Sequence, residues 1–386
     1  MENPVGGEEF LRKIISLIVA IVVVAASVGF IAVHDAFTPK PPVEKLDIGT
    51  CDYVKIYVLE ERGWKRLKGP DSLIGDIFAY GGMAVSQYKF DIWWEDIWKD
   101  PSRLALGTAF ACEVGAEGKV WKFFFGVGWN APHMKRMYKL CGFSDDLHEL
   151  DFVAICHEHI DHFWAIPAVL EVRPDIPIII HEGFSDRAKA WLKELGHTGP
   201  LYIVPFMKPV TRKDIPILPP GFALVAFPGW IILDVYGEQG GVFNIKDRGL
   251  VTVTGCCHMG IVPLMHYAAT HFKVERDNYY GLYGGLHIAL AEDWSPERND
   301  WLIYVKKLDL EGIFANHCTG RVTWRKMVAM DMPAYWARTG HKILFGETIK
   351  WWDREDNLIL EIYQSEGKWV YKAHMPIPEP PPPGGW

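Results

Sequence analysis

The longest apolar stretch of the chain runs from Ile14 to Val33 and contains no charged residue. About 20 apolar residues are enough for a helix to cross a bilayer. Arg12 and Lys13 precede the stretch, and this positive charge predicts that residues 1–13 are cytoplasmic. We therefore expect a membrane anchor at 14–33, or alternatively an uncleaved signal, because no A-x-A-like cleavage site is clear. A proline-rich linker follows at 34–45, and the rest of the chain would be extracytoplasmic.

Beyond the linker, short apolar runs typical of buried strands alternate with stretches of helical character. Strands are expected at 53–59, 120–125, 151–155, 176–180, 250–254, 279–283 and 312–315, and helices near 132–140, 166–172, 261–272 and 296–308. This β-α-β cadence predicts one domain over residues 46–352. A C-terminal hairpin around Ser365-Glu-Gly367 is expected within 353–374, and a proline-rich tail at 375–386.

The segment Ala154–Phe163 places three histidines and two carboxylates in six residues, directly after an expected strand. Imidazoles suit Zn, Fe or Mn, and a carboxylate adds a hard oxygen ligand. Alternate residues of an extended segment share a face, so His157 and His159 can point at one ion. If the chain then turns into a helix, Asp161 and His162 would swing toward a second ion. The HxHxDH spacing therefore predicts a metal site rather than a cluster of satisfied loop histidines.

Three more histidines directly follow expected strands, and these are His258, His287 and His317. Clefts in α/β proteins open at the carboxyl ends of strands, so we expect these side chains to meet the HxHxDH segment. His258 and His317 are interpreted as ligands. His287 has two interpretations, as a ligand or as a residue that supports a ligand or contacts substrate. His181 also follows a strand and is expected to line the pocket.

Seven cysteines are scattered through the chain, at positions 51, 112, 141, 156, 256, 257 and 318, and no two form a CxxC pair. A structural zinc ribbon is therefore not expected. Cys156, Cys318 and one of Cys256 or Cys257 adjoin histidines interpreted as ligands. They would line the site or, as we favour, act as small buried packing residues.

The composition narrows the function classes only a little. Of 386 residues, 49% are hydrophobic, which is ample for a buried core. The net charge of −8 gives no basic footprint for nucleic acid. The chain has 17 tryptophans, and the aromatic segment Phe90–Trp98 predicts an interfacial helix, a lid or core packing. A Trp-rich surface or the proline-rich tail would suit a protein partner.

The HEHIDH segment followed by distant strand-end histidines resembles the metallo-β-lactamase superfamily, whose αββα sandwich holds one or two metals at the edge between its sheets. Gly249–Ile261, Tyr283–His287 and Asn316–Gly320 look like the branch that contains the dihydropterin-ribofuranosylaminobenzene phosphate synthases. The resemblance implies an α/β fold, an α+β sandwich of the αββα metallo-β-lactamase type, here with an N-terminal transmembrane helix.

The resemblance also implies ligand roles in two sets: His157, His159 and His258 for a first metal, and Asp161, His162 and His317 for a second. His287 falls where relatives place a bridging or second-site ligand. Relatives usually carry Asp-Thr-Gly after the strand that here ends at Phe125, whereas this chain has Gly126-Val-Gly128. The departure removes a carboxylate that commonly braces such a site.

These features predict a membrane-anchored, metal-dependent hydrolase. One or two divalent ions, Zn²⁺ first with Fe or Mn as alternatives, would activate a water to attack an ester, lactone or phosphoester. Asp161 is expected to orient or deprotonate that water. The expected partners are a small-molecule substrate and the membrane, through 14–33, and not nucleic acid. Two alternatives stand beside this: a pterin-type transferase like the synthases, and an extracytoplasmic subunit of a membrane assembly that keeps the fold as a scaffold.

Overall fold

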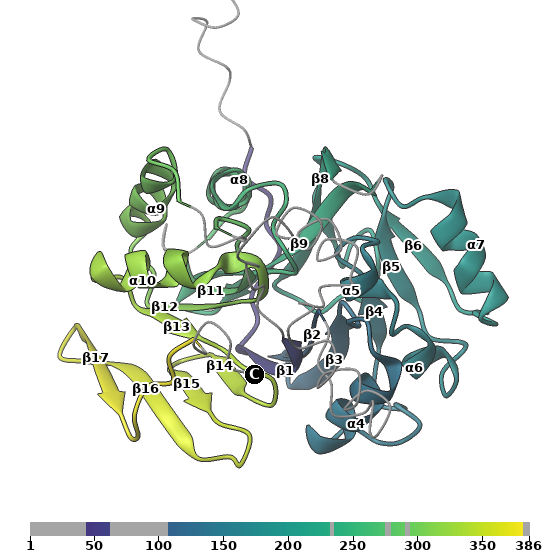
Figure 1. Cartoon of the computed structure of the whole chain (residues 1–386), viewed down its shortest axis with the longest axis horizontal. Helices are drawn as coiled ribbons and strands as arrows, with labels where there is room; N and C mark the ends of the chain where they lie inside the picture. The colour runs from purple at the N-terminus through teal and green to yellow at the C-terminus, as the bar shows by residue number, and fades with distance from the viewer. Residues whose placement is uncertain (1–43, 62–106, 232–234, 275–278, 290–293, 381–386) are drawn as a thin grey trace, which may run out of the picture. The chain divides into compact units, whose positions relative to one another are not determined.

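The computed structural model describes residues 44–61, 107–231, 235–274, 279–289 and 294–380. The described elements form a mixed α/β fold with two sheets (Figure 1), which confirms the predicted class at this level. The predicted anchor at 14–33 and the aromatic segment at 90–98 lie outside the described residues. Among the helices that the structure describes, none is long and apolar enough to cross a membrane.

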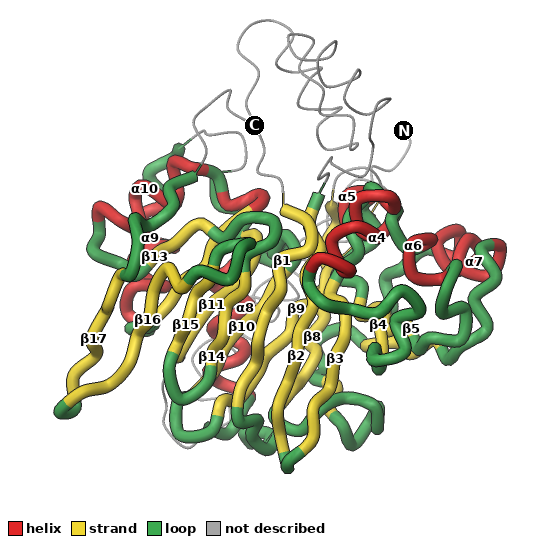
Figure 2. The backbone as a smooth tube through the Cα atoms, turned by 90° about the horizontal axis from the view of Figure 1, so that it is seen from below, coloured by secondary structure: helices red, strands yellow, loops and turns green. Residues whose placement is uncertain are grey.

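The larger sheet has ten strands in the order β17-β16-β15-β14-β1-β2-β3-β4-β5-β6 (Figure 2). From β3 to β6 the strands are parallel, and from β3 back to β17 they pair antiparallel. The strands are β1 (Tyr53–Glu61), β2 (Thr108–Ala116), β3 (Lys119–Phe125), β4 (Phe152–Ala154), β5 (Ile178–His181), β6 (Leu201–Val204), β14 (Lys342–Phe345), β15 (Ile349–Trp352), β16 (Leu358–Ser365) and β17 (Lys368–Ala373).

The smaller sheet has seven strands in the order β13-β12-β11-β10-β9-β8-β7. Its strands are β7 (Val210–Thr211), β8 (Phe222–Ile231), β9 (Val235–Ile245), β10 (Gly249–Thr254), β11 (Tyr279–Gly285), β12 (Gly312–Asn316) and β13 (Ala334–Trp336). The strands β10 to β13 run parallel, so their carboxyl ends lie along one edge of the sheet.

Two groups of helices cover the sheets. The helices are α4 (Ala131–Leu140), α5 (Ile160–Phe163), α6 (Pro167–Leu170), α7 (Asp186–Glu194), α8 (Ile261–His271), α9 (Arg298–Lys307) and α10 (Arg321–Ala329), with a short 3₁₀ turn at His317–Thr319. The first four share an apolar core with β3 to β5, and α8 to α10 share another with β10 to β12 (Figure 1). A third core lies between the sheets.

The strand β3 shows how the sequence builds these layers. Side chains alternate across a strand, so Phe123 and Phe125 point into the core between the sheets while Phe124 packs beneath the helices. Phe123 stacks on Phe152 at 4.3 Å between ring centroids and also meets Phe222 of the other sheet at 5.1 Å. These aromatic contacts join the two sheets.

Most predicted elements are present, with local changes that proline explains. The strand expected at 176–180 begins only at Ile178, because Pro177 has no N–H to donate to the ladder. The helix expected at 166–172 is a single turn, since Pro174 disfavours helical backbone just before it. The long antiparallel pair β8–β9 was not foreseen from the sequence.

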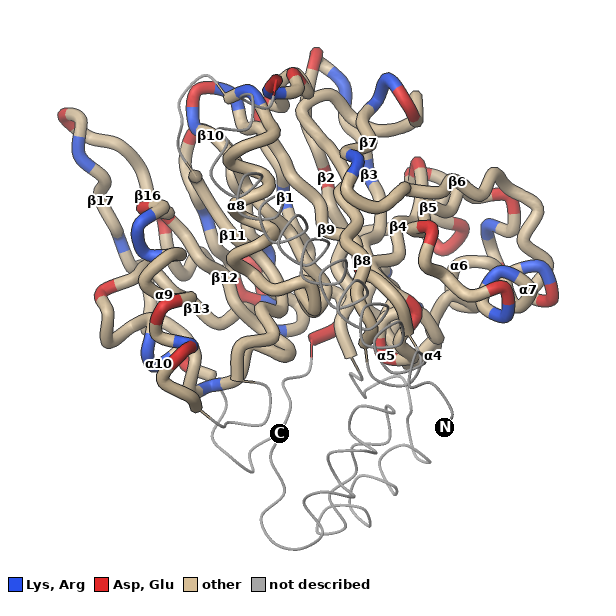
Figure 3. Tube along the Cα trace, turned by 90° about the horizontal axis from the view of Figure 1, so that it is seen from above, with Lys and Arg blue, Asp and Glu red and all other residues tan. Residues whose placement is uncertain are grey.

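Charged residues of both signs are interspersed along the described part of the chain. Figure 3 shows them mainly at the turns between strands and on the outer helices, while the strand interiors carry few of them. This distribution fits the three apolar cores, because an unpaired charge is costly to bury. The buried acidic residues near the histidines are therefore exceptions that need an explanation.

Candidate metal centre

Four strand ends deliver histidines to one place. His157 follows β4 in the larger sheet, whereas His258, His287 and His317 follow β10, β11 and β12 in the smaller one. The parallel ladders align Thr254 with Gly284 and Gly285 with Asn316, so the three exits lie side by side. The predicted meeting of these histidines with the HxHxDH segment is therefore seen in the structure.

The first group consists of His157, His159 and His258. Nε2 of His157 lies 2.9 Å from Nδ1 of His159. The ring of His258 lies 4.9 Å from that of His157 and 5.2 Å from that of His159, between centroids. Since His159 still has extended backbone, it and His157 present their rings to the same space, as their spacing predicts.

The second group consists of Asp161, His162 and His317. The chain turns into the one-turn helix α5 at Ile160, which carries Asp161 and His162 toward the end of β12. Oδ2 of Asp161 lies 3.6 Å from Nε2 of His162 and 3.5 Å from Nε2 of His317. The two groups adjoin, because the rings of His157 and His162 are 4.1 Å apart between centroids.

His287 lies beside the first group. Its ring centroid is 4.3 Å from that of His258. Both rings are partly exposed, whereas His157, His162 and His317 are fully buried. His258 and His287 therefore lie on the more open side of the centre. His181, which is expected from the sequence to line the pocket, is buried against Phe184 and Phe206. Glu158, the other carboxylate of the HxHxDH segment, accepts hydrogen bonds from the backbone N–H and the hydroxyl of Ser185.

The protonation states suit metal binding. Burial, reinforced by the neighbouring imidazoles, lowers the pKa of His157, His162 and His258 well below its ordinary value. Neutral imidazoles keep the lone pair that a divalent metal needs. Nε2 of His258 is buried and has no hydrogen-bond partner among the described residues. A metal ion would satisfy that atom, so the donor set fits a divalent metal.

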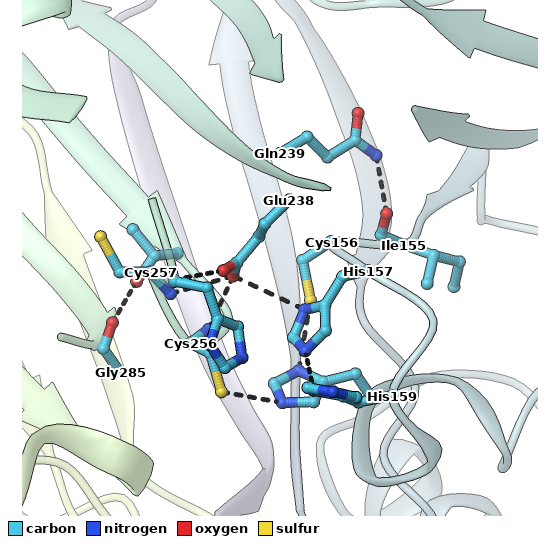
Figure 4. Close-up of polar contacts among 12 residues, drawn as sticks. Ile155, Cys156, His157, His159, Glu238, Gln239, Cys256, Cys257 and Gly285 are labelled. Carbon is cyan, nitrogen blue, oxygen red and sulfur yellow. Dashed lines mark hydrogen bonds and ion pairs between the residues drawn. The ribbon is translucent and has the colours of Figure 1, made fainter. Parts of the chain in front are cut away.

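Sequence reasoning missed Glu238, which lies on β9 against the centre (Figure 4). Its carboxylate accepts hydrogen bonds from the backbone N–H groups of Cys256, Cys257 and His258. Its Oε1 also lies 3.6 Å from Nδ1 of His157. Burial raises the pKa of this carboxyl to about 7, against the three N–H donors that lower it. An acidic residue in a glycine-rich run was the only signal in the sequence.

The cysteines near the histidines are buried, as expected, but two of them do more than pack. Sγ of Cys156 lies 3.2 Å from Nδ1 of His162, and Sγ of Cys256 lies 3.1 Å from Nε2 of the same ring. Cys257 instead packs in the core beneath α8. The interpretation as packing residues therefore needs correction for Cys156 and Cys256.

The strand ends adopt backbone conformations that most side chains avoid. Cys257, His287 and His317 have positive φ values of 68°, 46° and 47°. Left-handed backbone is costly for residues other than glycine and concentrates at functional sites. The backbone N–H of His317 is held by Glu61, whose Oε1 accepts it at 3.1 Å. This contact helps to fix the direction in which His317 leaves β12.

The turn Gly126-Val-Gly128 has no carboxylate of its own, yet an acidic group from β1 lies close to it. Glu60 and Glu61 are both buried at the end of β1. A Cβ added at Gly128, whose φ is +73°, would lie 1.9 Å from Oε2 of Glu60. The glycine therefore makes room for a carboxylate that comes from a different strand.

The chain was compared with protein families and with curated proteins. No family model matches the chain. The chain is 23% identical over 307 residues to the 7,8-dihydropterin-6-methyl-4-(beta-D-ribofuranosyl)-aminobenzene-5'-phosphate synthase of Methanocaldococcus jannaschii, a match that covers 71% of this chain and 90% of that protein.

Solved structures were also compared. A metal-dependent hydrolase of the beta-lactamase superfamily matches 75% of this chain and 98% of its own, with 15% identity and a TM-score of 0.49. An N-acyl homoserine lactone hydrolase matches 75% of this chain and 93% of its own, with 11% identity and a TM-score of 0.33. The synthase match agrees with the branch that the sequence resembles, because the chain is similar to a dihydropterin-aminobenzene phosphate synthase.

Proposed function

We propose that the chain is a metal-dependent hydrolase with the αββα metallo-β-lactamase fold and two divalent ions, most simply Zn²⁺. The observation that carries the proposal is the pair of adjoining donor groups at the strand ends. One group offers three imidazoles, and the other offers two imidazoles and the carboxylate of Asp161, whose Oδ2 lies 3.5 and 3.6 Å from the ring nitrogens. Imidazole and carboxylate also suit Fe or Mn.

The reaction would combine the metals with the protein's own groups. When bound, the ions would supply an acidified water as nucleophile and would polarise the substrate oxygen. Asp161 would orient that water and accept its proton, because α5 holds its carboxylate between the two imidazoles of the second group. Burial raises the pKa of this carboxyl to about 7 in the metal-free site. His258 and His287 would face the substrate, since they are only partly buried.

The substrate class follows from that chemistry, and an ester, a lactone or a phosphoester is proposed. The direct test is elemental analysis of the purified chain together with hydrolysis assays on these three classes. Two ions per chain and metal-dependent turnover are expected. Asp161→Ala should abolish turnover while circular dichroism shows a folded domain. Full activity in a folded, metal-free variant contradicts the proposal.

A pterin-type transferase is the second candidate, favoured by the match to the synthase of Methanocaldococcus jannaschii. In that case the metals would bind a pyrophosphate leaving group instead of activating water. Incubating the metal-loaded protein with a pterin pyrophosphate and an aminobenzene acceptor separates the two candidates. A coupled product supports the transferase, and hydrolysis alone supports the hydrolase.

The membrane location is proposed from the sequence. Residues 14–33 would anchor the chain as a single-pass protein with the metal centre outside the cytoplasm. The remaining alternative, a scaffold subunit of a membrane assembly, would use the Trp-rich surface or the proline tail as contacts. Co-purification from detergent-solubilised membranes without metal would support the scaffold, whereas two bound ions would support the enzyme.

A further inference from the structure

We infer that Cys256 is a thiolate ligand of the second ion, completing a set with Asp161, His162 and His317. The inference rests on the proposed metal centre and adds to it a donor that neither the sequence nor the resemblance assigns. It also separates the two cysteines that touch His162. Cys256 would bind the metal, and Cys156 would only support the ring.

The ring of His162 lies between two sulfur atoms. Its Nε2 faces Sγ of Cys256 at 3.1 Å and Oδ2 of Asp161 at 3.6 Å. Its Nδ1 faces Sγ of Cys156 at 3.2 Å. An imidazole binds a metal through one nitrogen, while the other donates its proton to a supporting group. Because the carboxylate lies on the Nε2 side, Nε2 is the ligand atom, and Cys256 shares its side.

The distances among these donors are close to those within one coordination sphere, with the sulfur contact the shortest of them. Tetrahedral zinc sites have bonds of about 2.0 to 2.3 Å, so two donors on one ion are separated by about 3.3 to 3.6 Å. The separations from Nε2 of His162 to Cys256 and to Asp161 are 3.1 and 3.6 Å. That from Asp161 to Nε2 of His317 is 3.5 Å. Cys256 belongs to two groups whose donor atoms lie within 4.8 Å of one another, one with His162 and His317 and one with His157 and His258, and its 3.1 Å contact with Nε2 of His162 favours the second ion.

The 3.1 Å contact could instead be a thiol hydrogen bond to His162. That arrangement cannot persist once a metal takes the lone pair of Nε2, because the thiol then loses its acceptor. The sulfur would be left beside the ion, since Cys256 is buried and Glu238 holds its backbone N–H at 2.9 Å. A metal ion on Nε2 would therefore lie beside this sulfur, which favours ligation.

Cys156 has a different setting. A Cβ added at Gly255 would lie 2.4 Å from Sγ of Cys156 and 3.0 Å from Nδ1 of His162. The sulfur therefore packs in the space that the glycine leaves open, on the side of the ring away from Asp161. From there it can accept the Nδ1 proton and set the orientation of His162.

Binding of the metal by Cys256 requires only the loss of the thiol proton. The S–H bond breaks, its proton passes to solvent, and a sulfur–metal bond forms without any change in oxidation state. Thiolate is a soft ligand, so its presence favours zinc over manganese or magnesium. Cys256 would thus narrow the choice of metal that the histidines and the carboxylate leave open.

The test is X-ray absorption spectroscopy at the zinc edge, on the full-length chain loaded with zinc. The expected spectrum contains a sulfur scatterer at about 2.3 Å, with about half a sulfur per ion because one thiolate serves one of two ions. Cys256→Ser should lose this scatterer. Cys156→Ser, the matched control on the other side of the same ring, should keep it.

Two results would overturn the inference. One is a wild-type spectrum with two zinc ions bound and only nitrogen and oxygen neighbours, a result that leaves the proposed hydrolase intact. The other is a sulfur scatterer that survives in Cys256→Ser. Failure of the wild-type chain to bind any divalent metal would overturn both the inference and the proposed function, whereas binding of iron or manganese without zinc would overturn the inference alone. Since the wild-type spectrum decides first, the outcome does not depend on the variants folding.

Discussion

Oε1 of Glu238 lies 3.6 Å from Nδ1 of His157, and both side chains are buried. The same carboxylate accepts the backbone N–H groups that lead into His258. One acidic residue on β9 therefore orients ligands from both sheets, His157 by its ring and His258 by its backbone. A carboxylate behind a ligating imidazole also makes the imidazole a stronger donor.

Replacing Glu238 with glutamine should weaken metal binding without removing a ligand. The amide keeps an acceptor for the loop that ends at His258, but it loses the charge beside Nδ1 of His157. We expect metal affinity to fall about 10- to 100-fold, the usual effect of losing a group that supports a metal ligand. Competition with a chromophoric chelator measures this directly.

The matched control for Glu238→Gln is Glu158→Gln, which alters a carboxylate of the HxHxDH segment that bonds to Ser185 instead of to a histidine. Its metal affinity should stay at the wild-type value. Equal affinities for all three proteins would show that Glu238 plays no part in holding the ligands.

The histidine positions could be predicted because each directly follows an apolar run that forms a strand. Periodicity shows where β4, β10, β11 and β12 end, and parallel pairing then brings those ends together. Asp161 and His162 could be placed because the helical turn after His159 sits within the same short segment. The local sequence pattern was enough to predict a ligand's position wherever the ligand and the strand or helix that carries it are neighbours in sequence.

The supporting groups could not be predicted, because they come from elements with weak patterns. Glu238 lies on β9, where Gly237, Gly240 and Gly241 obscure the alternation typical of a strand. Glycine carries no side chain to mark a buried face. Glu61 lies 256 residues away from the His317 backbone that it holds, a pairing that depends wholly on tertiary structure.

The metal-free protein should lose stability as the pH falls from about 6.5 toward 5. Burial lowers the pKa of His157, His162 and His258, so below the unfolded value of about 6.5 the unfolded chain binds protons that the folded chain refuses. Burial also lowers the pKa of His181 to about 3 and of His287 to about 4, in the same direction. Each proton that the unfolded chain binds in excess of the folded chain lowers the free energy of unfolding by about 1.4 kcal/mol per pH unit of acidification.

Two buried carboxyls act in the opposite direction. Burial raises the pKa of Asp161 and Glu238 to about 7, so the folded chain keeps protons there that the unfolded chain loses above about pH 4. The imidazoles with a lowered pKa outnumber these two carboxyls. The net result expected between pH 5 and 6.5 is therefore a loss of stability on acidification. Urea midpoints of chelator-treated protein measure the balance, and a midpoint that rises on acidification would contradict it.

Substituting His287 should separate its two interpretations. Its φ of 46° favours asparagine as the replacement, because asparagine tolerates left-handed backbone. The ring lies 4.3 Å from that of His258, between centroids, at the open side of the centre. We therefore expect His287→Asn to retain two ions while its KM for the hydrolysed substrate rises. Elemental analysis of the metal content distinguishes the two interpretations. The control is His148→Asn, which replaces an exposed histidine. Loss of one ion would make His287 a ligand instead.

Gly107→Ala should disable the second ion specifically. Gly107 has a φ of +96°, and an added Cβ would lie 1.9 Å from the backbone oxygen of Asp161. We therefore expect alanine to displace Asp161 from His162 and His317, so that metal content falls toward one ion per chain. Gly118→Ala is the matched control, since its φ is +70° but open space surrounds its Cβ position. It should lose only about 1 to 2 kcal/mol of stability from backbone strain and keep both ions. Equal metal content in the two variants would show that the contact with Asp161 does not position the carboxylate.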